Sequence, residues 1–110
     1  MSLFDLTTET NGGTVRLALS GELDIASADH VEATLARVEE DAPPTLVLDL
    51  RQLAFVDSTG LRIIVAADER AREHGRRLVL VRGPEAIQRI LRMTRLDERL
   101  EIVDDPDAAA

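Results

Sequence analysis

Four consecutive residues, Asp57-Ser58-Thr59-Gly60, combine a carboxylate, two hydroxyls and a glycine directly after an apolar segment that ends in Phe55-Val56. A serine hydroxyl in such a place can act as a nucleophile, cap the first turn of a helix, or accept a phosphoryl group. Each role needs different surroundings, so the rest of the sequence has to discriminate among them.

A catalytic serine needs a base, usually a histidine that a third group holds in place. The chain has two histidines, His30 and His74. His74 lies some four turns, roughly 24 Å, from Ser58 along the same predicted helix at about 1.5 Å per residue. His30 falls in the first turn of another predicted helix, but no Gly-x-Ser-x-Gly elbow surrounds Ser58. We interpret both histidines as surface or cap residues of helices.

Other catalytic machinery is missing from the sequence as well. Asp57-Ser58-Thr59-Gly60 has one residue more than the Asp-Thr-Gly of aspartic proteases and no second copy. The chain has no Gly-x-x-x-x-Gly-Lys-Ser/Thr loop, which argues against a nucleotide-binding or hydrolytic protein. It has no cysteine, and its carboxylates do not fall at metal-ligand spacings with histidine. We therefore expect no catalytic residue, no metal site and no cofactor.

Composition narrows the possible partners. The 110 residues include 13 basic and 21 acidic residues, for a net charge of -8, and such a surface repels nucleic-acid backbones. No apolar run approaches the roughly 20 residues that span a bilayer, and the N-terminus lacks a signal pattern. We expect one domain over residues 1–110, located in the cytoplasm, with neither nucleic acid nor membrane as a partner.

Strand and helix patterns alternate along the chain and must together position Ser58. Strand character fills five segments, which are 3–8, 14–20, 45–50, 78–81 and 100–103. Helical patterns start near Ser27, Ser58 and Gly83-Pro84-Glu85, and a turn or short helix is expected at 96–99. This order predicts an α/β domain with a mixed sheet of four to five strands, begun by a hairpin, and three to four packed helices.

Local signals predict where these elements end. Ser27 is expected to be the N-cap of the first helix, and Gly75 to end the second helix. We expect the chain to leave the second strand at Gly21-Glu22-Leu23-Asp24, residues 51–56 to form a connection, and the acidic residues 104–110 to form a frayed tail.

Sheets with parallel crossovers place their sites in the loops that follow the carboxyl ends of strands. Two predicted loops fit this rule, 21–27 and 55–60, and the second would expose Ser58 at the start of a helix. The simplest role for Ser58, with Asp57 beside it, is to cap that helix.

A helical wheel divides the segment after Ser58 into two faces. The predicted core side comprises Gly60, Ile63, Ile64, Ala67, Ala71 and His74. The predicted outer face comprises Arg62, Ala66, Glu69 and Glu73, with Val65 at its edge. That outer face is a candidate docking surface, and a solvated helix face would show the same pattern.

The order of these motifs resembles the STAS domain of bacterial anti-sigma factor antagonists. The likeness covers nearly the whole chain and rests on four segments: Gly21-Glu22-Leu23-Asp24, Leu46-Val47-Leu48-Asp49-Leu50, Phe55-Val56-Asp57-Ser58-Thr59-Gly60-Leu61 and Leu96-Asp97. After Asp24 the sequence departs from commoner members, because Ile25-Ala26-Ser27-Ala28 replaces their frequent Thr-Ala-Pro. The resemblance implies a small protein-binding regulator and not an enzyme.

In that family the serine of the Asp-Ser-Ser/Thr-Gly motif is phosphorylated by a partner that is both an anti-sigma factor and a serine kinase. The unmodified form binds this partner and frees the sigma factor, and a separate serine phosphatase reverses the modification. The resemblance thus implies Ser58 as the phosphorylation site. We expect the protein to be a monomer or weak dimer. The expected partner-binding residues are Asp24, Asp57, Thr59, Gly60, Arg62, Ala66 and Glu69. The alternative within the same family is an interaction module in a sensory or transporter-associated complex without a kinase cycle.

Overall fold

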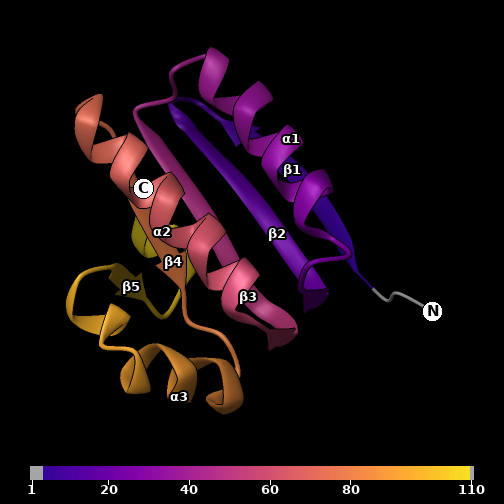
Figure 1. The fold of residues 1–110 in the computed structure, drawn as a ribbon. Coiled ribbons are helices and arrows are strands. Elements are labelled where there is room, and N and C mark those ends of the chain that lie inside the picture. Colours follow the sequence, from indigo (N-terminus) through magenta and orange to yellow (C-terminus); the bar gives the residue numbers. More distant parts are fainter. Residues whose placement is uncertain (1–3, 110) are drawn as a thin grey trace.

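The computed structural model describes residues 4–109, so the start of the first predicted strand at Leu3 lies outside the described residues. In chain order the elements are β1 (Asp5–Asn11), β2 (Thr14–Leu23), α1 (Ala28–Glu40), β3 (Thr45–Val56), α2 (Ser58–Glu73), β4 (Arg77–Val81), α3 (Glu85–Met93), the 3-10 helix η1 (Leu96–Glu98), β5 (Glu101–Val103) and the 3-10 helix η2 (Pro106–Ala109). Figure 1 shows their arrangement.

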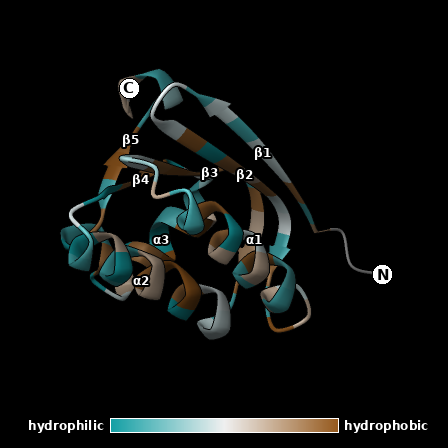
Figure 2. Ribbon diagram, turned by 90° about the horizontal axis from the view of Figure 1, so that it is seen from above, coloured by the Kyte–Doolittle hydropathy of each residue, from teal (hydrophilic) through white to brown (hydrophobic). Residues whose placement is uncertain are grey.

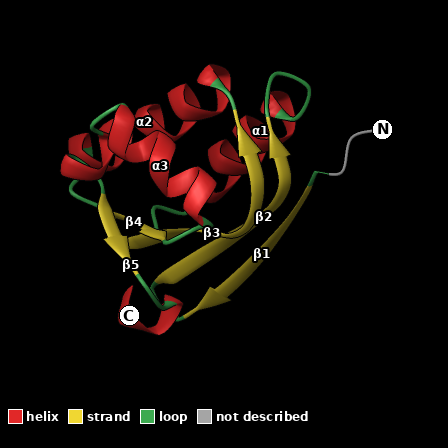
Figure 3. Ribbon diagram, turned by 90° about the horizontal axis from the view of Figure 1, so that it is seen from below, coloured by secondary structure: helices red, strands yellow, loops and turns green. Residues whose placement is uncertain are grey.

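The strands form one five-stranded sheet in the order β1-β2-β3-β4-β5. β1 and β2 are an antiparallel hairpin, whereas β2, β3, β4 and β5 run parallel to one another. The helices α1, α2 and α3 lie together on one face of this sheet, as Figure 3 shows. The predicted α/β class, the opening hairpin and the mixed sheet are confirmed.

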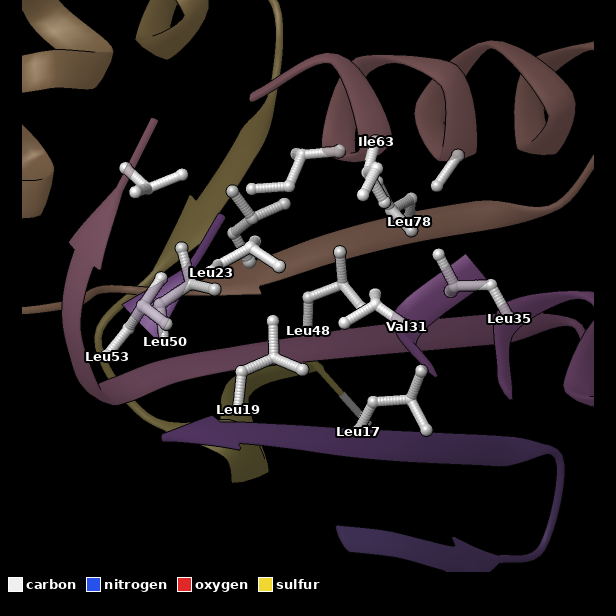
Figure 4. Close-up of a cluster of buried hydrophobic side chains, with 14 of the residues drawn as sticks. Leu17, Leu19, Leu23, Val31, Leu35, Leu48, Leu50, Leu53, Ile63 and Leu78 are labelled. Carbon is white, nitrogen blue, oxygen red and sulfur yellow. The ribbon is translucent and has the colours of Figure 1, made fainter. Parts of the chain in front are cut away.

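The main core fills the space between the sheet and these three helices, as Figure 4 shows. Leu17, Leu19 and Leu48 point from the strands toward Val31 and Leu35 of α1, and all five side chains are buried. The chain buries aliphatic side chains almost exclusively, because it contains two phenylalanines and no other aromatic residue. In Figure 2 the apolar colour is concentrated in the central strands, whereas β1 is mostly pale or hydrophilic.

The opposite face of the sheet has a small apolar cluster of its own. Val47, Val79 and Val81 are buried there, and Ala109 of η2 covers them with only 1% of its surface exposed. The carbonyl of Ala109 also accepts a hydrogen bond from Arg77 Nη1 at 2.9 Å. The prediction of a frayed tail is therefore wrong for residues 104–109. The end of the chain packs on the sheet and covers apolar side chains on the face opposite α1, α2 and α3.

Two further boundaries differ from the predictions. β2 continues through Gly21 to Leu23, and residues 51–56 belong to β3 and not to a connection. In the extended part of the two strands, Glu22 pairs with Phe55 and Leu23 pairs with Val56. The pairing register shifts twice before this point, and Gly21, at the second shift, has a φ of 86°. These irregularities interrupt the alternation of buried and exposed residues that strand prediction relies on.

α2 follows its predicted faces with two exceptions. Ile63, Ile64, Ala67 and Ala71 of α2 are buried, but His74 is exposed because the helix ends at Glu73. Asp68 is buried instead, and it pairs with Arg72 at 2.9 Å and with Arg99 at 3.5 Å.

Gly75 follows α2 with φ +66, as predicted for a helix terminator. None of the helices within residues 4–109 combines the length and the apolar character that crossing a bilayer requires.

Candidate functional site

Ser58 is the first residue of α2 and is exposed to solvent. The cap of this helix is Asp57, whose Oδ1 accepts a hydrogen bond from Gly60 N at 2.9 Å. No residue within 4–109 forms a hydrogen bond with the Ser58 hydroxyl. The prediction that Ser58 caps the helix is therefore wrong. The Asp57 carboxylate takes that role because it stands one residue earlier, from where it accepts the N–H of the third helical residue.

Gly60 brings the start of α2 against the ends of two strands. A Cβ at Gly60 would lie 2.7 Å from the carbonyl oxygen of Leu23 and 2.7 Å from Cγ2 of Val56, which is closer than side-chain carbons approach such atoms. The backbone N–H of Asp57 donates to the same Leu23 carbonyl at 3.2 Å. Gly60 thus fixes the position of Ser58 relative to the end of β2.

The loop after β2 is held by a compact set of hydrogen bonds. Asp24 Oδ1 accepts from the backbone N–H groups of Ala26 at 3.0 Å and Ser27 at 3.2 Å. The hydroxyl of Ser27 is buried, donates to the carbonyl of Glu22 at 2.9 Å and accepts from Asp24 N at 3.0 Å.

Ser27 occupies the cap position of α1 but makes no side-chain cap hydrogen bond, so the cap prediction is wrong in mechanism. Its hydroxyl instead ties the loop back onto the end of β2. Asp24 likewise has a structural task, which is to close the turn that leads into α1.

Two large apolar side chains stand in the exposed surface of these loops. Ile25 is 78% exposed and Phe55 is 47% exposed. Phe55 sits opposite Glu22 in the sheet, one residue before the Leu23–Val56 pair that contacts Gly60. The sequence did not identify Phe55 as a surface residue, because the extension of β3 to Val56 was not predicted.

The charges of the two loops are all acidic, namely Glu22, Asp24 and Asp57. Arg62 is the one basic residue in the first two turns of α2. It is exposed, and no residue within 4–109 pairs with it. Along the chain, the residues that precede Ser58 in its loop contribute only acidic charge, and Arg62 is the first basic residue after it.

The predicted partner-binding residues differ in solvent exposure. Arg62 and Glu69 are exposed, Ala66, Asp24, Asp57 and Thr59 are half-buried, and Gly60 is buried. Glu69 Oε1 lies 3.6 Å from Arg99 Nη2, so it is already engaged in an ion pair. It also lies about 16 Å from Ser58 along α2, at about 1.5 Å per residue. Asp57, Thr59 and Arg62 lie within about one helical turn of Ser58 along the chain, and the bond from Asp57 N to the Leu23 carbonyl joins the start of α2 to the strand end that precedes Asp24. Glu69 lies about three turns further along α2.

Both histidines lie on the surface, as predicted. His30 is exposed on the first turn of α1 and makes an edge contact with Phe4, with ring centroids 5.9 Å apart. His74 is exposed at the other end of α2, where its Nδ1 lies 2.8 Å from the carbonyl oxygen of Arg70. A groove of about 720 Å³ next to it is lined by Glu39, Arg70 and Arg76, among others. This groove and His74 are at the opposite end of α2 from Ser58.

Within residues 4–109 there is no group of three or more His, Asp or Glu side chains that could hold a metal ion. Asp49 is a buried carboxylate of β3, and Arg51 Nη2 lies 2.8 Å from its Oδ2. Burial raises the pKa of Asp49, but hydrogen bonds from Arg51 and the charges of Arg51 and Arg16 outweigh it, so the pKa lies below its ordinary value. This pair stabilises the charged carboxylate and gives the sheet face a fixed charge cluster.

Comparison with known proteins identifies a domain family and several named relatives. A family model described as STAS domain matches residues 5–109. The anti-sigma-F factor antagonist RsfB of Mycobacterium tuberculosis is 32% identical over 78 residues, which cover 71% of this chain and 64% of RsfB. The chain thus spans less than two thirds of that relative.

Two further relatives cover more of both chains. The anti-sigma-B factor antagonist of Listeria monocytogenes is 28% identical over 88 residues, which cover 80% of this chain and 77% of that protein. The crystal structure of an anti-sigma factor antagonist from Mycobacterium paratuberculosis has a TM-score of 0.88 at 29% identity, covering 96% of this chain and 90% of that one.

Proposed function

This chain belongs to the STAS domain family, and from that premise we propose that it is an anti-sigma factor antagonist switched by phosphorylation of Ser58. In the unphosphorylated form it binds an anti-sigma factor that also has serine kinase activity, and the sigma factor is released. Phosphorylation of Ser58 ends the binding, and a serine phosphatase restores it. The similarity to an anti-sigma-F factor antagonist and an anti-sigma-B factor antagonist supports this role.

The observation that carries the proposal is that Asp57 caps α2, which leaves the Ser58 side chain exposed and without a hydrogen bond to the rest of residues 4–109. A kinase can therefore modify Ser58 without breaking a bond of the fold. Thr59 is the competing acceptor, but it is half-buried.

Phosphoryl transfer needs a co-substrate and a base that the kinase supplies. The Ser58 oxygen forms a bond to the γ-phosphorus of ATP as the bond between that phosphorus and the β,γ-bridging oxygen breaks. ADP leaves, and the hydroxyl proton passes to the base on the kinase. This chain contributes the acceptor oxygen and its fixed position, and is not an enzyme.

The new charge acts on the partner more than on the fold. A phosphate adds about -1.5 to -2 charges at neutral pH, which the start of a helix accommodates through its dipole. A partner carboxylate about 4 Å away would be repelled by up to roughly 4 kcal/mol at an effective dielectric constant of about 20. That is near three decades of affinity at about 1.4 kcal/mol per decade. A local charge can thus release the partner without refolding the domain.

The docking surface of this proposal surrounds Ser58. It comprises Asp24 in the loop after β2, Thr59 and Arg62 in the first turns of α2, and Ala66 and Glu69 further along that helix. Asp57 and Gly60 contribute by holding the start of the helix, because one caps it and the other packs on Leu23. The protein works in the cytoplasm as a monomer or weak dimer.

The test is incubation of the protein with candidate anti-sigma kinases and ATP, followed by mass mapping of the acceptor residue. We expect one phosphate on Ser58 and none on the Ser58→Ala variant, with Thr59→Ala modified like the wild type. Modification of Thr59 in the wild type, or of Ser58→Ala to the same extent, would overturn the assignment of the acceptor.

A further inference from the structure

Arg62 lies one helical turn after Ser58 on the same side of α2. Both residues are exposed, and they are four positions apart within the helix Ser58–Glu73. Side chains at this spacing are neighbours, with Cβ atoms about 5–6 Å apart. Because the Cα–Cβ bonds of a helix tilt toward its N-terminus, the long side chain of Arg62 extends back over the turn that begins with Ser58.

Arg62 is also free to take a new partner. Other arginines of α2 are engaged: Arg70 bonds Glu39 at 2.6 Å, and Arg72 bonds Asp68 at 2.9 Å. By contrast, no residue within 4–109 pairs with Arg62. The two loops beside Ser58 contain no basic residue, so Arg62 is the nearest cation along the chain to the Ser58 hydroxyl.

We propose that Arg62 is the intramolecular partner of the phosphoryl group on Ser58, so that phosphorylation withdraws this guanidinium from the docking surface. The inference rests on the proposed function and adds to it the fate of the phosphate. An acidic group four positions before a basic one is the favourable order on a helix, and phosphate oxygens accept hydrogen bonds from the planar guanidinium in pairs.

The proposal changes what the modification does to the surface. Before phosphorylation, Arg62 is exposed and can bind a carboxylate of the anti-sigma factor. Afterwards the surface has gained a phosphate and has lost a free arginine. Both changes weaken the attraction for a partner carboxylate, so one modification acts twice in the same direction.

The experiment uses the full chain with phosphoserine encoded at position 58 during expression, so no kinase is needed. A ³¹P NMR titration then measures the second pKa of the phosphate in the wild type and in Arg62→Gln. A guanidinium beside the dianion favours it, so we expect the wild-type pKa to lie roughly 0.2–0.4 below that of Arg62→Gln. Arg62→Lys keeps the charge and should restore most of the difference.

The matched control is Arg37→Gln. Arg37 is an exposed arginine on α1 with no pairing partner within residues 4–109, so its removal changes the net charge equally. It should leave the phosphate pKa unchanged. The ¹⁵N shift of Arg62 Nε should also move between the unphosphorylated and phosphorylated proteins.

Equal phosphate pKa values in the wild type, Arg62→Gln and Arg37→Gln would overturn the inference, as would a ¹⁵N shift of Arg62 that does not respond to phosphorylation. Failure of every kinase to modify Ser58 would instead contradict the proposed function. The two failures are thus read from different experiments.

Discussion

The α-carbon of Gly60 lies so close to the Leu23 carbonyl that an added Cβ would be 2.7 Å from the oxygen. This contact joins the first turn of α2 to the end of β2, two segments more than thirty positions apart in sequence. It determines where Ser58 stands relative to the loop that contains Asp24 and Ile25. Figure 1 shows how the start of α2 and the end of β2 come to the same end of the sheet.

The first prediction concerns this contact. Gly60→Ala should lower the free energy of unfolding by about 1–3 kcal/mol, because the methyl group overlaps backbone and side-chain atoms that are already packed. Urea unfolding measures the change. Gly75→Ala is the comparison for backbone strain alone, since its Cβ would meet nothing within 4 Å and its φ of +66° should cost about 1–2 kcal/mol. Equal stability of Gly60→Ala and the wild type would show that the close approach is absent.

The second prediction separates the cap from the phosphate acceptor. Asp57→Ala should destabilise the protein by about 1 kcal/mol, because the hydrogen bond to Gly60 N is lost. Asp57→Ser should retain most of the cap, and Ser58→Ala should leave the stability within about 0.5 kcal/mol of the wild type. Thermal and urea unfolding of the three variants check this. A larger loss for Ser58→Ala than for Asp57→Ala would reverse the two roles.

The third prediction concerns pH. The pKa of Asp49 is lowered in the folded protein, so its contribution is complete above the unfolded pKa and is lost as pH falls through the folded value. Asp49→Asn should therefore cost roughly 1–3 kcal/mol at pH 7 through the weakened bonds to Arg51. The gap to the wild type should shrink below about pH 4. The control is Asp41→Asn, which removes an exposed carboxylate that has no pairing partner within residues 4–109 and should show no such gap. A gap that does not change with pH would exclude the ion pair as its source.

The fourth prediction tests the packed C-terminal turn. Ala109→Asp would place a carboxylate against Val47, Val79 and Val81, and should cost about 1–3 kcal/mol or displace η2 from the sheet. Ala108→Asp adds the same charge one residue earlier at an exposed position and should have little effect. Urea unfolding compares the two variants. Equal stability of both would restore the view of a frayed tail.

Several elements could be predicted because their signals are local. The hairpin that begins the sheet and the end of α2 at Gly75 each follow from neighbouring residues. The placement of Ser58 at the start of α2 followed for the same reason, since an apolar strand runs directly into an apolar helix.

The remaining features depend on contacts between distant segments. Ala109 is buried only because three valines from β3 and β4 line up beneath it, and an isolated Asp-Asp-Pro-Asp tail carries no sign of them. The extension of β2 to Leu23 depends on its pairing with Val56 across a register shift. The choice of Asp57 over Ser58 as the cap is a matter of one position, which is within the uncertainty of any helix boundary read from a sequence.

The central claim is that a phosphate on Ser58 releases the partner, and calorimetric titration tests it most directly. The anti-sigma kinase is titrated with the unphosphorylated protein, with the protein that has phosphoserine encoded at position 58, and with Ser58→Ala, which cannot be modified. We predict tight binding of the unphosphorylated protein and of Ser58→Ala, and an affinity lower by up to about three decades for the phosphorylated protein. Equal affinity of the phosphorylated and unphosphorylated proteins would contradict the switch.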